Sequence, residues 1–320
     1  MSTANVVPET FALKGGDARR TQSRARIALV LNDSVARFRW ADGFSHARAL
    51  AFQTVLTLLP GVIVAVGFAT VVHQQALSDT IVRVLDSLAP GPTADVLREA
   101  AQQGSSNAGA DSGRRALVIG ALVMLVSAAT TFGQIERGAN RIYGVEKDRP
   151  SLRKYGVATL MAMTSGAVLA GAFVLVAFGH EVGDGIRWKG GASAVAIGRW
   201  PVGALLLAAG YALIFCFSPR RRQPSPTWLV FGAALSVLVT FLATVGLAQY
   251  LNLSSSFGEM YGPLAGFMGV MLWSYLNAIG LFLGLAFAAQ LEAFRAGEAE
   301  PQSEEKVQSS EPELVASGVS

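Results

Sequence analysis

Charged residues are scarce in this sequence, and they are unevenly placed. They make up 15% of the 320 residues, whereas 52% are hydrophobic, and a soluble domain has about 25% charged residues. Charge is absent from six runs, each of at least 19 residues, close to the roughly 20 that a membrane-spanning helix needs. The runs are 49–72, 116–135, 156–179, 201–219, 223–258 and 260–291. Because a soluble core would intersperse charges on its wet faces, this distribution predicts an all-α bundle of six transmembrane helices.

Cysteine and catalytic motifs are also nearly absent. The one cysteine, Cys216, excludes an intrachain disulfide and a cysteine zinc site. The motifs HExxH, CxxC, GxxxxGKS and GxSxG do not occur, and the three histidines show no metal-ligand spacing. No Asp or Glu lies inside the six runs, although intramembrane carboxylates often mark proton or cation relays. The sequence therefore predicts neither an enzyme nor a cofactor or metal site.

The ends of the chain differ from its middle. The first 40 residues contain no continuous apolar segment, so we expect no cleaved signal peptide and assign 1–40 to a cytoplasmic N-terminal segment. Apolar side chains from Ile27 to Phe38 recur near one helix face, with Arg37 elsewhere. They predict an amphipathic helix, either on the membrane surface or packed beneath the bundle. The six-helix domain then covers 41–291, and the Glu-rich residues 292–320 are expected to form a disordered acidic cytoplasmic tail.

Lys and Arg concentrate on one side of the predicted membrane. Segments on the side of the N-terminus hold 19 of these residues, and segments on the other side hold 7. Cytoplasmic segments carry such an excess, so both ends of the chain are expected in the cytoplasm. The net charge of +4 therefore indicates topology rather than nucleic-acid binding. It also favours a contact between the bilayer's anionic lipid headgroups and the protein.

Polar residues form a stripe on each of the first two runs. Gln53, Thr57 and Pro60 share one helix face at i, i+4 and i+7. The same spacing relates the residues of the second stripe, which are Ser127, Thr131 and Gln134. Pro60 predicts a kink, which is either purely structural or opens a cavity lined by polar side chains. The loop 73–115 is expected to hold two short helices that cap the bundle or merely connect its helices.

The segment 137–154 follows the second run and carries six basic residues. Asn140 and Gly144 within it indicate the end of a helix. Two interpretations remain open for this segment: a solvated basic loop, or a site for a partner or a lipid headgroup.

Small residues form a stripe along the last run. It advances by three or four residues and comprises Gly262, Gly266, Gly269, Trp273, Asn277, Gly280 and Gly284. Small residues at this spacing let helices approach closely, so we expect packing within the chain or between copies in a homo-oligomer. Asn277 is expected either to hydrogen-bond a neighbouring helix or to line a path.

Three stretches together resemble the YihY/BrkB family of bacterial inner-membrane proteins. The first is ALAFQTVLTLLP, which ends at Pro60, and the second is GQIERGANRIYGVEKDRP. The third is YGPLAGFMGVMLWSYLNAIGLFLG. The residues that carry the second and third resemblances are Asn140, Arg141, Tyr143, Gly144, Val145, Tyr261, Gly262, Pro263, Leu272 and Trp273. The chain departs from the family at Gln53, where an aromatic residue is common, and at Gly284–Phe287, where a glutamate is common.

The resemblance implies a multi-pass protein of the bacterial inner membrane. It also brings an old ribonuclease label, which the residues do not support because no His/Asp cluster is present to hold a catalytic metal. We expect transport or translocation of a lipid or other amphiphile. The alternative is a scaffold protein for envelope integrity that transports nothing.

Overall fold

The computed structural model describes residues 4–10, 16, 27–71, 99, 102, 111–184, 191–253, 255–298 and 300–302. These residues form helices α2 (Ile27–Trp40), α3 (Gly43–Val71), α6 (Asp111–Ile142), α7 (Ser151–Asp184), α8 (Gly191–Phe217), α9 (Pro226–Leu253), α10 (Ser255–Tyr261), the 3₁₀ turn η1 (Gly262–Leu264) and α11 (Ala265–Ala296). Within the described ranges no strand occurs, apart from a single bridge between Ala4 and Gln302. The all-α prediction is confirmed.

Six helices are long and apolar enough to cross a membrane, and each overlaps one of the six charge-free runs. These spans are Gly43–Val64, Val118–Ile142, Ser151–Phe173, Ile197–Phe217, Pro226–Leu253 and Ala265–Ala296. Many large apolar side chains point outward from them, such as Leu152, Leu205 and Ile197, which are 93%, 70% and 73% exposed. Contiguous apolar surface on this scale is unusual for a soluble monomer and fits a protein surrounded by lipid.

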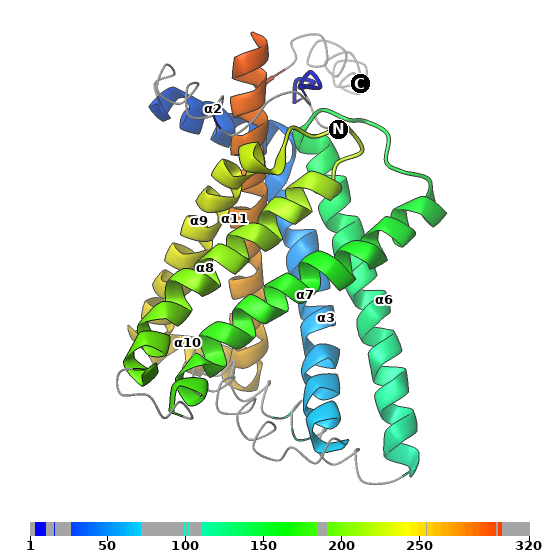
Figure 1. Cartoon of the computed structure of the whole chain (residues 1–320), viewed down its shortest axis with the longest axis vertical. Helices are drawn as coiled ribbons and strands as arrows, with labels where there is room; N and C mark the ends of the chain where they lie inside the picture. Colours follow the sequence, from blue (N-terminus) through cyan, green and yellow to red (C-terminus); the bar gives the residue numbers. More distant parts are fainter. Residues whose placement is uncertain are drawn as a thin grey trace, which may run out of the picture.

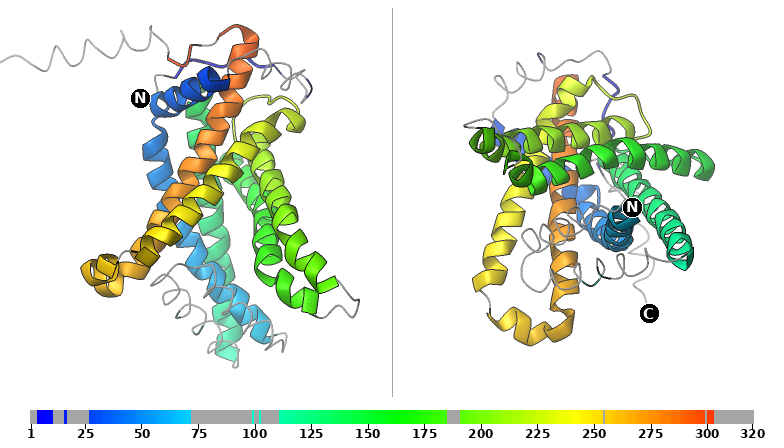
Figure 2. Two further views of the ribbon diagram at one scale, coloured as in Figure 1. Left: turned by 90° about the vertical axis from the view of Figure 1, so that its left-hand side faces the viewer. Right: turned by 60° about the horizontal axis from the view of Figure 1, so that its bottom comes forward.

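The helices pack as sequence neighbours. α3 lies against α6, α7 against α8, and α9 against α11, while α11 also contacts α3 and α2 (Figure 1). One end of the bundle holds α2, the last turns of α6 and α11, and the α8–α9 connection. We call it the basic end, because it carries a large share of the arginines. The helices approach one another there and diverge toward the opposite end (Figure 2).

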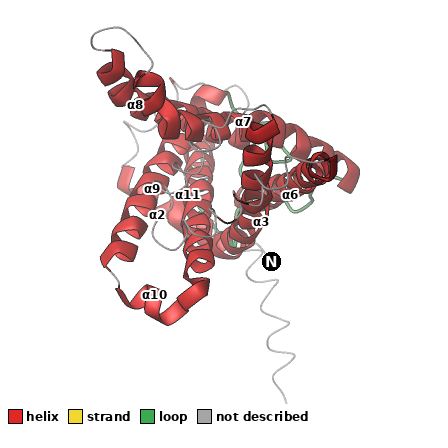
Figure 3. Ribbon diagram, turned by 90° about the horizontal axis from the view of Figure 1, so that it is seen from below, coloured by secondary structure: helices red, strands yellow, loops and turns green. Residues whose placement is uncertain are grey.

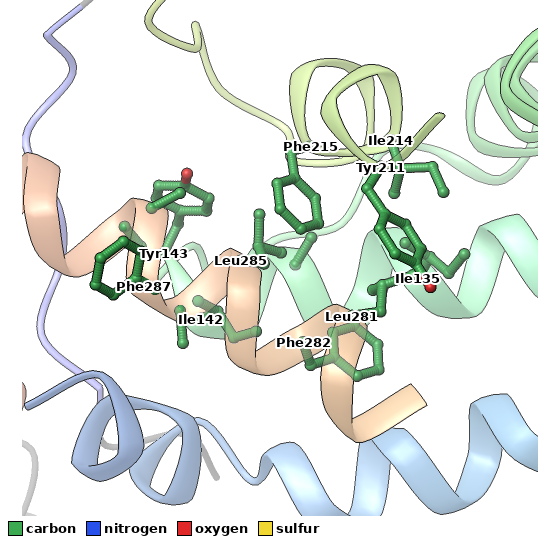
Figure 4. Packing of buried hydrophobic residues seen from close by; sticks show 14 of the residues in the cluster. Ile135, Ile142, Tyr143, Tyr211, Ile214, Phe215, Leu281, Phe282, Leu285 and Phe287 are labelled. Atoms are coloured by element: carbon green, nitrogen blue, oxygen red, sulfur yellow. The ribbon is translucent and has the colours of Figure 1, made fainter. Parts of the chain in front are cut away.

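The buried core follows this shape. Its cluster of buried side chains lies in the halves of the helices nearest the basic end, around Phe282 and Leu285 of α11. Figure 4 shows Ile142, Phe215 and their neighbours converging on these two residues. Since lipid is as apolar as these side chains, the cluster stabilises the bundle through close packing rather than through escape from water. A view from the opposite end shows the helix pairs spread apart (Figure 3).

α2 combines features of the two arrangements expected for it, on the membrane surface or packed beneath the bundle. It packs on α11 and buries Val30 and Phe38 there, while Ile27 remains 53% exposed on its other side. Arg37 was expected away from the apolar face, but it is fully buried. The expectation was wrong because a polar partner on α11, described below, receives the guanidinium.

Two further expectations concern the loop 73–115 and the start of the acidic tail. The loop 73–115, with its two expected short helices, lies almost wholly outside the described residues, and α6 begins within it at Asp111. The acidic tail was expected to begin at 292, yet α11 continues to Ala296 and buries Glu292. Gly297 then ends the helix in the left-handed conformation with φ 87°, and the N–H of Glu298 bonds back to the Ala293 carbonyl.

Candidate functional site

The two polar stripes predicted on α3 and α6 face each other. The hydroxyls of Thr57 and Thr131 are 2.9 Å apart, and Thr131 also lies 3.1 Å from the Gln53 carbonyl, to which it can donate. Thr130, which the stripe prediction omitted, donates to Oε1 of Gln53 at 3.0 Å. Ser127 contributes its backbone carbonyl, which accepts from Thr131 at 2.9 Å. We call these five residues the polar seam.

Further polar contacts lie on the basic-end side of the seam, and Pro60 follows the seam on its other side. Gln134 lies 3.3 Å from Nδ1 of His46, whose ring is 6.3 Å from that of Phe282. Pro60 lies inside α3, which continues as helix on both sides of it. The seam lies near the middle of the α3 span, at the edge of the buried cluster that includes Leu50 and Phe132.

The glycine stripe of the last run packs on α9, but it is not continuous. A Cβ on Gly284 would collide with Gly232 and Ser236 of α9, so the two backbones are in close contact. Trp273 donates to Thr244 of α9 at 3.2 Å. Asn277 donates to the carbonyl of Trp273 in its own helix at 2.7 Å, so this bond reaches neither a neighbouring helix nor a path.

The prediction of a continuous stripe was wrong at its start, where Gly262 lies outside α11. Gly262 has a φ of 49° and belongs to η1, so Gly262 and Gly266 do not lie on one α-helical face. Tyr261 ends α10 with its ring 4.9 Å from that of Phe257. Pro263 stands at the start of η1. Because a residue before proline is disfavoured in the α conformation, the Gly262–Pro263 pair separates α10 from α11.

Asn140 and Gly144 end α6 as predicted, and both are held by contacts at the basic end. Asn140 donates to Asp148 at 2.9 Å and accepts the backbone N–H of Arg220 at 2.7 Å. Gly144 has a φ of 74°, and a Cβ there would lie 2.8 Å from the Val6 backbone. The N-terminal segment therefore requires glycine at this turn.

The segment 137–154 is solvated only in part, since Lys147 and Arg153 are exposed whereas Lys154 is buried. Arg149 forms a salt bridge of 3.0 Å to Glu136 and donates to the Ser218 carbonyl at 2.8 Å, with side-chain exposures of 14% and 2% for the ion pair. Asp148 accepts from Lys154 at 3.2 Å. Partial burial would raise the pKa of Asp148, but the hydrogen bonds from Asn140 and Lys154, with the charge of Lys154, lower it below 3.8.

Two buried arginines tie the N-terminal segment to the bundle. Arg37 donates to Gln290 of α11 at 2.7 Å and to the Asn5 carbonyl at 2.8 Å, and burial lowers its pKa to about 10. Arg221 lies over the Tyr143 ring, with its guanidinium carbon 4.5 Å from the centroid. Burial raises the pKa of Tyr143, which keeps this phenol neutral beneath the cation.

A cavity of about 330 Å³ opens beside these arginines. Its lining comes from the N-terminal segment, the start of α7 and the α8–α9 connection, and comprises Glu9, Arg149, Arg153, Arg220, Arg221 and Arg222. Five guanidinium groups around one cavity attract anions. No cluster of three or more His, Cys, Asp or Glu suited to a metal ion occurs among the residues that the structure describes.

Comparison with known proteins identifies the family. The model of the family described as Virulence factor BrkB matches residues 34–309. The chain belongs to the BrkB family. This match confirms the resemblance drawn from the three sequence stretches. It covers the polar seam and the five arginines of the cavity, but not Glu9.

Relatives of this BrkB chain are named as membrane proteins. The UPF0761 membrane protein azo3165 of Azoarcus sp. (strain BH72) is 28% identical over 257 residues, which cover 78% of this chain and 60% of that protein. RC1_0578 of Rhodospirillum centenum, another UPF0761 membrane protein, is 28% identical over 289 residues, or 88% and 62% of the two chains. The ribonuclease-like protein YfkH of Bacillus subtilis (strain 168) is 22% identical over 259 residues, or 79% and 92%.

The chain spans about three fifths of the length of the UPF0761 relatives that it matches. No solved structure matches it. Together with the six apolar helices, the comparisons show a multi-pass membrane protein of the BrkB family.

Sequence reasoning found the polar seam but missed most of the basic end. Glu292 was assigned to a tail and Arg37 to a wet helix face, although both are fully buried. One signal was available: the triplet Arg220–Arg222 and the acidic residue Glu292 both flank spans on the same predicted side of the membrane.

Proposed function

We propose that this BrkB-family protein is a non-enzymatic protein of the bacterial inner membrane that moves a lipid or other amphiphile across or within the bilayer. The basic end is cytoplasmic in this proposal, as its excess of Lys and Arg favours. The observation that carries the proposal is the position of the polar seam. It lies between α3 and α6 at the edge of the buried cluster, in a bundle whose helices spread apart away from the basic end.

This position suits an amphiphile that enters sideways from lipid. Hydroxyl and amide groups of the seam, such as Thr57, Thr131 and Gln53, can exchange their mutual hydrogen bonds for bonds to a polar headgroup. The acyl chains meanwhile stay among the diverging apolar helices. Such an exchange avoids leaving a polar group without a partner in hydrocarbon, which costs several kcal/mol per group.

Reconstitution into vesicles tests the proposal. We expect the protein to accelerate translocation of fluorescent phospholipids. Thr57→Val combined with Thr131→Val is expected to slow it by roughly thirtyfold, because each of the two lost headgroup bonds is worth about 1 kcal/mol. Thr164→Val is the matched control, since Thr164 on α7 is exposed and bonds only to the Leu160 carbonyl of its own helix. Equal rates with and without protein, for every headgroup assayed, would contradict the proposal.

A scaffold role is the second candidate, and the hydrogen bonds between α3 and α6 favour it. In that case the double variant lowers the melting temperature while an envelope-integrity phenotype stays intact. We expect no cleavage of RNA by the purified protein with added divalent metal, because the proposed role is non-enzymatic.

A further inference from the structure

Four of the five arginines that line the cavity fall into two pairs. Arg149 and Arg221 form a fixed floor: Arg149 bonds to Glu136 and to the Ser218 carbonyl, and Arg221 donates to Glu292 at 2.7 Å. Arg221 also donates to the carbonyls of Val7 and Pro8 at 3.2 and 3.1 Å. Their side chains are only 14% and 3% exposed. These contacts use most of the N–H donors of both guanidinium groups.

Arg153 and Arg220 differ, because both are exposed and retain open donors. Nη1 of Arg220 donates to the carbonyls of Lys147 and Asp148 at 3.4 and 2.8 Å, which leaves Nε and Nη2 without partners among the described residues. Arg153 makes no hydrogen bond or ion pair with any part of the chain that the structure describes. Each presents a guanidinium edge that matches two oxygens of one anion.

The carboxylates at the cavity pair with only some of its arginines. Glu136 forms an ion pair with Arg149 and Glu292 with Arg221, whereas Arg153 and Arg220 form no ion pair with a carboxylate among the described residues. Glu9 accepts the backbone N–H of Arg222 at 3.2 Å, so the N-terminal segment places a carboxylate in the cavity lining itself. Like charges in one pocket repel, and a bound anion relieves that repulsion.

We propose that this cavity binds a phosphate group, with Arg153 and Arg220 as its direct ligands and Glu9 as a competing anion. The phosphate belongs either to the headgroup of an anionic lipid or to a free phosphate ion, since both present the same oxygens to the guanidinium edges. A volume of about 330 Å³ holds such a group, as it lies within the usual range of ligand sites. The proposal goes beyond the proposed function and stands apart from the polar seam.

Binding to the full chain in neutral detergent tests it, with dihexanoyl phosphatidic acid and inorganic phosphate as probes. We expect Arg153→Gln combined with Arg220→Gln to weaken binding by about tenfold or more, because each removes charge-assisted hydrogen bonds. Arg39→Gln is the control: it removes one charge from an exposed side chain of α2, outside the cavity. We expect Glu9→Gln to tighten binding severalfold, and Glu298→Gln, exposed at the same end, to leave it unchanged.

The two probes distinguish the source of the phosphate. Saturable binding of phosphatidic acid that inorganic phosphate fails to displace assigns the site to a lipid headgroup, whereas displacement at similar concentrations assigns it to free phosphate. Absence of saturable binding by either probe overturns the proposal, and so does an equal loss of affinity in Arg39→Gln. If the double variant does not fold, the comparison of Glu9→Gln with Glu298→Gln decides alone. Because this readout requires no translocation, its failure and failure of the vesicle assay are separable.

Discussion

Nη2 of Arg221 donates to Oε1 of Glu292 at 2.7 Å, with side-chain exposures of 3% and 0%. The same carboxylate oxygen accepts the backbone N–H and the hydroxyl of Thr10. One oxygen therefore joins the N-terminal segment, the α8–α9 connection and the end of α11. Two of these segments, the N-terminal segment and the α8–α9 connection, also line the arginine cavity, so the ion pair holds these two walls of the proposed phosphate site against α11.

Glu292→Gln is expected to destabilise the protein by about 3–5 kcal/mol, since it leaves the buried charge of Arg221 without its counter-ion. The melting temperature in detergent measures this loss. Replacing both partners, with Arg221→Met and Glu292→Leu, should recover much of it, because no unpaired buried charge then remains. The control Glu298→Gln alters an exposed carboxylate. A melting temperature of Glu292→Gln equal to that of the control would refute the structural role of the pair.

Gly284→Ala is expected to cost about 1–3 kcal/mol, because an added methyl group in a filled contact forces helices apart. Its Cβ would collide with Gly232 and Ser236 of α9. Gly246→Ala is the matched variant, since no atom lies within 4 Å of its added Cβ. Thermal unfolding of both variants should show a clear decrease for the first and none for the second. A decrease in Gly246→Ala as large as that in Gly284→Ala would indicate a general helix effect instead.

Thr57 and Thr131 should show a coupling energy of about 0.6 kcal/mol in a double-mutant cycle, the usual value for a hydrogen bond between membrane helices. The single variants Thr57→Val and Thr131→Val keep the shape of each side chain and remove the hydroxyl. Equilibrium unfolding of the four proteins in mixed micelles gives the coupling. Strictly additive effects would mean that the 2.9 Å contact contributes nothing to stability.

Stability should fall with acid below about pH 4, in part through Asp148. Its pKa in the folded protein lies below the ordinary value of 3.8. A carboxyl group with a lowered folded pKa contributes stability above its unfolded pKa and loses it as the pH falls toward the folded one. Asp148→Asn should therefore flatten the profile of melting temperature between pH 5 and about pH 3. A profile as steep as that of the unmodified protein would assign the acid sensitivity to other groups.

Cysteine labelling tests the orientation of the bundle. In a Cys216→Ser background, Glu298→Cys at the basic end should react with a membrane-impermeant maleimide only after cells are opened. Leu253→Cys, at the opposite end and 84% exposed, should react in cells whose outer barrier alone is permeabilised. The expectation follows from the excess of basic residues on the cytoplasmic side. The reverse pattern of labelling would invert the topology.

The sequence was sufficient for features that depend on neighbouring residues. Absence of charge over some 20 positions defines a span without any tertiary information, and spacing by three or four residues places Gln53 and Thr57 on one face. The spans and the shared face required only helical geometry. That this face meets Thr131 did not follow from spacing, because residues 72–110 separate α3 from α6, and it is seen only in the structure.

Burial of charge at the basic end was not predictable in this way. Arg37 and Gln290 are 253 positions apart, and Arg221 and Glu292 are 71 apart. No local sequence pattern reveals such pairs. Without its distant partner, each charged residue is interpreted as solvent-exposed. The break at Gly262 was predictable in principle, because the following Pro263 disfavours a helical conformation at the glycine, but the regular spacing of small residues obscured it.

The bond between Arg37 and Gln290 can form only late in synthesis. The arginine leaves the ribosome with α2, whereas its amide partner emerges only with α11. Until then Arg37 has only its earlier partners, such as the carbonyls of Asn5 and Ile142. We therefore expect a nascent chain halted before α11 to be cleaved by quality-control proteases more readily than the complete chain.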